Sequence, residues 1–104
     1  MYASKIIQIY QSLTLEELRG IRKWFSINFV LKNDAEYKLF DFIDTRRSIS
    51  ELSVKKERAF QFLFSDKKYD DLKMRHIMSN TTEEMETFLA YHTFRKKRSS
   101  EKLQ

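Results

Sequence analysis

The sequence contains no cysteine and no proline, and it has a single glycine, Gly20. The lack of cysteine excludes a disulfide scaffold, a thiolate zinc site and a cysteine nucleophile. The scarcity of glycine and proline argues against a β-rich fold, because tight hairpin turns draw on residues that tolerate positive φ. One glycine also cannot build a phosphate-binding loop, in which several glycines let backbone amides approach the anion. These absences favour helices.

Long hydrophobic runs are also missing, although 41% of the residues are hydrophobic. The first apolar stretch is interrupted by Gln8 and Gln11, and no run approaches the ~18 residues of a membrane span. A chain of 104 residues can bury one core without disulfides or metals. We therefore expect a single soluble domain with no membrane partner, and a cytoplasmic location, since a reducing compartment suits a chain without cysteine.

Apolar residues recur at intervals of three and four in successive segments, which predicts amphipathic helices. A first helix is expected over about residues 3–13. Thr14 and Glu17 predict a capping box that begins a second helix, ending near residue 25. Gly20 lies inside this helix at a cost of ~1 kcal/mol relative to alanine, so it is either simply tolerated or marks a close helix contact.

The next two helices are predicted from capping residues and apolar stripes. A third helix should be capped by Asn33 or Asp34 and should end within residues 45–48. Ser53 is the expected cap of a fourth helix, and residues 65–69 form a short turn after it.

The last predicted helix, residues 70–94, has the most regular pattern of the chain. Thr81 and Glu84 form a second capping-box pattern at which this helix could break. We favour one continuous helix.

Together these segments predict an all-α fold, a compact bundle of about five helices. Residues 53–94 should form an αα-hairpin or a pair that resembles a helix-turn-helix. The helical domain is expected to cover residues 1–94, followed by a frayed basic tail at residues 95–104.

The residues that carry chemistry are scattered. His76 and His92 are separated by ~24 Å along the predicted helix, so they cannot share a metal ion within one chain. Adjacent carboxylates are best explained as solvated groups that complement helix dipoles; they are Asp41 with Asp44, Asp70 with Asp71, and Glu83 with Glu84. We therefore predict a protein that is not an enzyme, with no cofactor and no small-molecule substrate.

Aromatic residues suggest a docking surface. Nine Phe, five Tyr and one Trp exceed what a bundle of this size easily buries. The candidates for exposed anchors are Phe29, Tyr69, Tyr91 and Phe94. Our principal hypothesis is a protein-interaction or assembly domain, whose partner is another protein or a second copy.

The alternative hypothesis is a DNA-binding module. One basic group lies at the start of the last helix and consists of Lys67, Lys68, Lys73 and Arg75; a second lies in the tail and consists of Arg95, Lys96, Lys97 and Arg98. The tail, with five basic residues and one acid, carries +4 of the net charge of +5, so the body is almost neutral. Asp70 and Asp71 also accompany the first group. An ordinary αα-hairpin and a solvated tail are the competing interpretations.

The block from Phe64 to Ser79 reads Phe-Ser-Asp-Lys-Lys-Tyr-Asp-Asp-Leu-Lys-Met-Arg-His-Ile-Met-Ser. It resembles a family of larger, uncharacterised helical proteins from Bacteroidota, which share Leu-Phe, Tyr-Asp-Asp, Lys-Leu-Arg and Met-Ser elements followed by a helix ending in Phe-Leu. The stretch from Leu15 to Ile43 is similar to the amino-terminal region of that family, so the resemblance covers about residues 14–94. It implies a helical fold and no known activity, ligand or catalytic residue.

The sequence departs from this family in two places. Family members continue into a long helical body where this chain has its basic tail, and residues 79–82 are more polar than the usual leucine-rich continuation. The chain is therefore expected to be either the amino-terminal domain of a longer protein or a short relative. The same block is faintly similar to the helical part of winged-helix regulators, an analogy at the level of fold alone.

Overall fold

The computed structural model describes residues 1, 3–28, 34–46 and 48–102. In this part of the chain there are five helices and no strand, which confirms the all-α prediction. The helices are α1 (Lys5–Ser12), α2 (Leu15–Asn28), α3 (Ala35–Asp44), α4 (Lys56–Leu63) and α5 (Asp71–Lys102).

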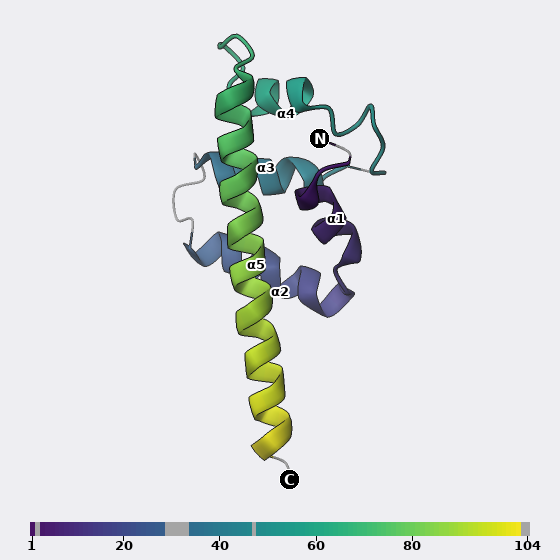
Figure 1. Cartoon of the computed structure of the whole chain (residues 1–104), viewed down its shortest axis with the longest axis vertical. Coiled ribbons are helices and arrows are strands. Elements are labelled where there is room, and N and C mark those ends of the chain that lie inside the picture. The colour runs from purple at the N-terminus through teal and green to yellow at the C-terminus, as the bar shows by residue number, and fades with distance from the viewer. Residues whose placement is uncertain (2, 29–33, 47, 103–104) are drawn as a thin grey trace.

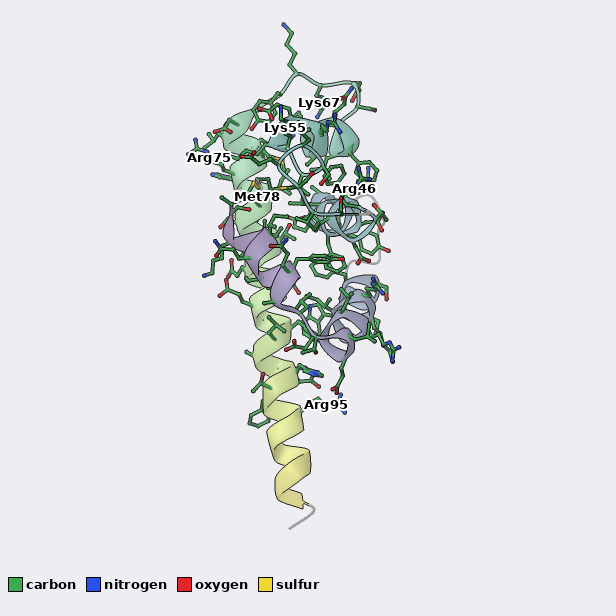
Figure 2. The ribbon with its side chains drawn as sticks, turned by 90° about the vertical axis from the view of Figure 1, so that its right-hand side faces the viewer. Arg46, Lys55, Lys67, Arg75, Met78 and Arg95 are labelled. Atoms are coloured by element: carbon green, nitrogen blue, oxygen red, sulfur yellow. The ribbon has the colours of Figure 1, made fainter. Side chains whose placement is uncertain are left out.

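The four short helices gather along one side of α5, as the two views in Figures 1 and 2 show. With 32 residues, α5 is ~48 Å long, and the molecule measures 56 × 28 × 22 Å. α1, α2 and α3 each pack directly against α5, whereas α4 packs mainly against α3. The carboxyl-terminal part of α5 extends past all four short helices (Figure 1).

The core lies between α5 and the short helices. α2 meets α3 through the stacked rings of Phe25 and Phe40, whose centroids are 4.6 Å apart. The side of α5 that faces the core repeats at intervals of three and four residues, with the buried residues Met74, Ile77, Met78, Thr81, Thr82, Met85 and Phe88.

Two buried threonines explain why α5 does not break at the capping-box pattern of Thr81 and Glu84, where the sequence left a break open. The hydroxyl groups of Thr81 and Thr82 donate to the carbonyl oxygens of Ile77 and Met78, both at 2.7 Å. A threonine that bonds one turn back within its own helix satisfies its polar group without ending the helix. The helix is continuous through this region, as we favoured.

The capping box before α2 is confirmed. The backbone N–H of Glu17 donates to Thr14 Oγ1 at 3.1 Å, and the backbone N–H of Thr14 donates to Glu17 Oε1 at 2.8 Å. The helix that follows continues to Asn28, beyond the predicted end near residue 25. Ile27 consequently lies in α2, and its side chain is exposed.

The predicted caps of α3 and α4 need correction. Asp34 precedes α3, yet its side chain makes no capping hydrogen bond, and Asn33 lies outside the described residues. Ser53 does not cap α4, which begins later, at Lys56. Its hydroxyl instead accepts from the backbone N–H of Ser50 at 2.9 Å, while the Ser53 N–H donates to Ser50 Oγ at 3.1 Å. This reciprocal pair closes a turn, and buried Val54 anchors it to the core.

α5 continues beyond Phe94, where the last helix was predicted to end, and its backbone is helical to Lys102. Residues 95–102 contain neither glycine nor proline, and lysine and arginine are good helix formers. Cationic side chains near a helix C-terminus also interact favourably with the helix dipole.

Within the residues that the structure describes, none of the helices combines the length and the apolar character needed to cross a bilayer.

Candidate protein-docking surface on α5

The predicted aromatic anchors do not form one patch. Phe29 lies outside the described residues. Tyr69, Tyr91 and Phe94 are exposed by 38%, 49% and 62%. Tyr69 precedes α5, whereas Phe94 lies ~35 Å further along the axis of that helix. Tyr91 and Phe94 are therefore the pair that the fold brings together.

Tyr69 is held by local contacts. Its hydroxyl donates to Asp71 Oδ1 at 2.7 Å, and its ring meets the ring of Phe60 edge-on at 5.4 Å. Partial burial, followed by this hydrogen bond, raises the pKa of Tyr69 above its usual value. The same hydrogen bond lowers the pKa of Asp71, and Lys56 and Arg75 nearby act in the same direction. These contacts hold the Tyr69 side chain at the junction between α4 and α5.

Tyr91 and Phe94 are three residues apart and so lie on neighbouring positions of α5. The ring of Tyr91 lies 5.8 Å from that of Trp24 in α2, and the guanidinium of Arg95 lies 5.8 Å from the Tyr91 ring centroid. Trp24 is itself fixed by its Nε1–H, which donates to Glu84 Oε1 at 2.7 Å. Tyr91 is thus supported on one side by α2, while Phe94 is the more exposed of the two.

The exposed aromatic pair belongs to a longer stripe that faces away from the core. We call this stripe the outer face of α5; it comprises Glu83, Thr87, Ala90, Tyr91 and Phe94, all exposed. Its members recur at three and four residues, so they occupy one side of the helix, opposite the buried residues. The hydroxyl of Thr87 donates to the carbonyl oxygen of Glu83 at 2.9 Å, which satisfies its donor within the helix.

An open groove with carboxylate groups runs beside this face. Its volume is about 430 Å³. We call it the acidic groove, and its lining residues are Asp34, Glu36, Asn80, Glu83, Glu84 and Thr87. The amide of Asn80 bridges the two helices by donating to Glu36 Oε1 at 3.3 Å. The groove therefore joins α3 to the middle of α5 and presents negative charge next to the outer face.

The first basic group is largely engaged in contacts of its own. Lys67 and Lys73 place their ammonium groups 5.3 and 4.4 Å from the ring centroid of Phe64. Arg75 donates from Nε to an ion pair with Asp71 Oδ2 at 2.9 Å. Lys68 is exposed. Figure 2 shows Lys67 and Arg75 near the end of the molecule at which α5 begins.

The second basic group lies at the other end of α5, where Arg95 is exposed and positions 96–98 have helical backbone. Arg75 and Arg95 are separated by ~30 Å along the helix axis, so the two groups do not form one continuous patch. Helix-turn-helix readers also pack their two helices directly against each other. Here α4 packs mainly on α3, so the geometry gives this hypothesis little support.

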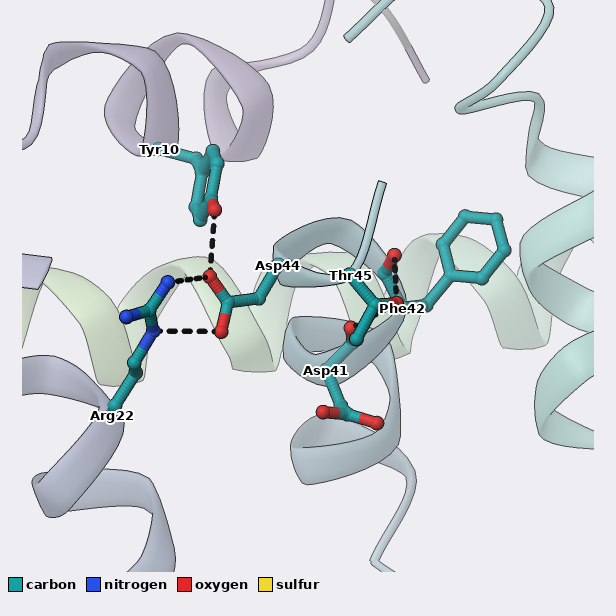
Figure 3. Close-up of polar contacts among 6 residues, drawn as sticks. All are labelled: Tyr10, Arg22, Asp41, Phe42, Asp44 and Thr45. Carbon is teal, nitrogen blue, oxygen red and sulfur yellow. Dashed lines mark hydrogen bonds and ion pairs between the residues drawn. The ribbon is translucent and has the colours of Figure 1, made fainter. Parts of the chain in front are cut away.

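A polar network that no sequence pattern indicated links the first three helices (Figure 3). Tyr10 Oη donates to Asp44 Oδ1 at 2.7 Å, while Arg22 donates from Nε to Oδ2 at 2.8 Å and from Nη2 to Oδ1 at 2.9 Å. Burial and the hydrogen bond to Asp44 raise the pKa of Tyr10 to about 12, and the same carboxylate raises the pKa of Arg22. Thr45 then closes the end of α3 by donating to the carbonyl oxygens of Asp41 and Phe42.

This network holds the first three helices together. Asp44 accepts from both partners, and its side chain is only 14% exposed. No sequence signal could have found the network, because its members are far apart in the chain and each is common on helix surfaces.

The two histidines lie apart on α5, as predicted. His92 stacks on Phe88, with centroids 5.4 Å apart, and lies 3.9 Å from Glu16. Among the described residues there is no group of three potential ligands that could hold a metal ion.

Comparison of the chain with protein-family models, curated proteins and solved structures gives no match. The resemblance to helical proteins from Bacteroidota therefore stays a prediction.

Proposed function

We propose that this chain is a non-catalytic protein-docking domain that binds its partner through the outer face of α5. The observation that carries the proposal is the exposure of Tyr91 and Phe94 on α5, a helix whose carboxyl-terminal part extends past the bundle (Figure 1). A cytoplasmic location, expected from the absence of cysteine, is part of the proposal.

Energetic considerations support a partner at this position. An isolated helix is only marginally stable in water, and most helical stability in proteins comes from packing of an apolar face. The carboxyl-terminal part of α5 extends past the four short helices, so none of the helices in the described part of the chain covers it there (Figure 1). Burying a phenylalanine side chain fully contributes about 1.5–3 kcal/mol. A partner that covers Phe94 would therefore bind more tightly and would also stabilise the projecting end of α5.

The composition of the face also fits an interface. Aromatic and arginine residues are enriched at the centres of protein interfaces, and charged residues at the rim increase association rates. The outer face has Tyr91 and Phe94 near its end and four basic residues at positions 95–98 next to them. We therefore expect a helical partner surface with acidic residues near its apolar centre.

A photo-activatable amino acid in place of Phe94 tests the proposal in the native cell. We expect irradiation to link the chain to a protein. The matched control is the same amino acid in place of Leu72, which is 59% exposed on α5 but lies near the other end of that helix. Adducts of equal yield at both positions, or none at Phe94, would remove the proposal.

Nucleic-acid binding is the alternative function, motivated by the basic residues at the two ends of α5. It requires binding to duplex DNA that weakens steeply with salt and with the substitutions Lys73→Ala and Arg75→Ala. If the chain docks on a protein instead, these substitutions should leave any binding of DNA at low salt unchanged. Fluorescence anisotropy with a labelled duplex measures the difference.

A further inference from the structure

We infer that the docking partner is a second copy of this chain, bound antiparallel along α5 so that the outer faces of the two helices meet. This inference rests on the docking function proposed above and adds the identity and the register of the partner.

The distribution of charge along α5 sets the orientation. Positions 83, 84 and 86 carry carboxylates, and positions 95–98 carry four basic residues. Glu83 and Arg98 are separated by ~22 Å within one helix and so cannot pair with each other there. A parallel partner would place like charges opposite each other, which disfavours that arrangement. An antiparallel partner places the acidic segment of each copy opposite the basic segment of the other.

The same charges set the register. When the two helices are centred between Ala90 and Tyr91, Glu83 lies opposite position 98 of the second copy. This pairing occurs twice, because a two-fold axis relates the copies. Glu84 and Glu86 lie on the two flanks of the helix, where Glu84 accepts from Trp24 and Glu86 pairs with Lys5 of the same chain. The acidic groove beside Glu83 and Glu84 adds the carboxylates of Asp34 and Glu36 to the surface that the basic segment meets.

The centre of this arrangement is small and apolar. Phe94 of each copy lies opposite Thr87 of the other, and Ala90 lies opposite Tyr91. Helix axes approach to 8–10 Å according to the side chains at the contact, so Ala90 permits close approach. The hydroxyl of Thr87 is already bonded within its own helix, so it needs no partner when covered.

The spacing of the outer face also suits helix pairing. Positions 83, 87, 90, 94, 97 and 101 alternate at four and three residues, which is the spacing of a coiled-coil seam. Only Ala90 and Phe94 in this seam are apolar, so we expect association that is weak and depends on salt.

Single cysteines test the register, because the natural chain contains none. In the proposed register the two copies of Ala90→Cys are offset by only about 1.5 Å along the axis, whereas two copies of Glu83→Cys are about 22 Å apart. We expect oxidation to give a disulfide-linked dimer for Ala90→Cys and not for Glu83→Cys. Dimers of equal yield from both variants, or from neither, contradict the inference.

Charge reversal provides a test that a folding defect cannot imitate. Glu83→Arg and Arg98→Glu each place like charges opposite each other twice, so each variant alone should self-associate about tenfold more weakly. An equimolar mixture of the two variants should recover association, because the heterodimer restores opposite charges at every such contact. Sedimentation velocity measures all three samples, with circular dichroism as the check on helix content. Failure of the mixture to exceed the separate variants overturns the inference.

The photo-crosslinking result distinguishes failure of this inference from failure of the docking function. An adduct at Phe94 with twice the mass of the chain supports both. An adduct only with a different protein, together with a monomeric chain in sedimentation, leaves the docking function in place and removes the second copy as partner. The absence of any adduct removes both.

Discussion

Gly20 is the residue at which the structure decides between two interpretations of the sequence. A Cβ atom added at Gly20 would lie 2.6 Å from Cζ and 3.2 Å from Cε1 of Phe88. Phe88 is buried, and its ring meets Trp24 edge-on at 5.8 Å. Gly20 is therefore a close-packing position between α2 and α5, which is one of the two roles that the sequence left open.

Gly20→Ala should consequently destabilise the protein. Alanine gains ~1 kcal/mol in a helix interior, but overpacking a core costs about 1–3 kcal/mol. We expect a net loss of about 1 kcal/mol in the free energy of unfolding, measured with urea. The control is the same substitution in a Phe88→Leu background, where the ring is gone and alanine should stabilise. A stabilising effect of Gly20→Ala in the natural background would show that the ring moves aside without cost.

Tyr10 should make stability depend on alkaline pH. Its pKa is about 12 in the folded chain, against about 10 when unfolded. Between these values the unfolded chain loses the phenol proton while the folded chain keeps it. The stabilising contribution is therefore complete below pH 10 and is lost as pH rises toward 12.

Tyr10→Phe tests this dependence. As the pH rises from 10 to 12, the free energy of unfolding should fall by about 1 kcal/mol less in Tyr10→Phe than in the natural chain. This value is reduced for the partial exposure of the hydroxyl. Urea unfolding at several pH values between 9 and 12 gives the comparison. Tyr69→Phe is measured in parallel, because Tyr69 also has a raised pKa. Equal alkaline slopes for the natural chain and Tyr10→Phe would contradict the assignment.

At the scale of single elements, local sequence patterns were reliable where the interaction itself is local. The box formed by Thr14 and Glu17 spans three residues and is present as predicted. The pattern at Thr81 and Glu84 has the same residue types and spacing but forms no box. Thr81 is buried and bonds back to Ile77, and Glu84 accepts from Trp24 of α2. Tertiary packing thus determines which of two equivalent patterns caps a helix.

Thr14→Ala should shorten or loosen the start of α2. Loss of an N-cap side chain costs about 1 kcal/mol, so the urea midpoint should fall by a corresponding amount with an unchanged slope. Thr93→Ala is the matched control, because Thr93 is exposed within α5 and the substitution removes the same side-chain atoms. Equal effects of the two substitutions would mean that the capping hydrogen bonds contribute nothing measurable.

At the scale of the whole molecule, the network of Tyr10, Arg22 and Asp44 joins three helices through one carboxylate. Asp44→Asn keeps the size of the side chain but removes its charge and one acceptor. We expect a loss of about 1–3 kcal/mol in the free energy of unfolding, since both partners lose hydrogen bonds to a charged group.

A double-mutant cycle of Asp44→Asn with Tyr10→Phe measures how far the two groups act together. Residues in one hydrogen-bond network should show coupling of about 0.5–3 kcal/mol. Additive effects would indicate that the short distance between Tyr10 and Asp44 contributes no energy. Asp41→Asn serves as the control, because Asp41 lies on the same helix and takes part in the contacts of Figure 3 through its backbone carbonyl oxygen.

The sequence by itself determined that the chain is helical and where most helices lie, because helical periodicity and capping depend on residues a few positions apart. It also identified Tyr91 and Phe94 as exposed. It did not indicate that Tyr69 would be held by Phe60 and Asp71, or that the helix would continue through the basic residues after Phe94.

Only the tertiary structure decided which face of α5 stays uncovered and which surface residues meet. The stripes in the short helices all pack on one side of a helix that is longer than the bundle, so the opposite side and the end remain exposed. The network around Asp44 and the contact of Gly20 with Phe88 arise in the same way, from residues distant in the chain. Such contacts follow from the angles at which helices pack, and periodicity within one helix carries no information about its neighbours.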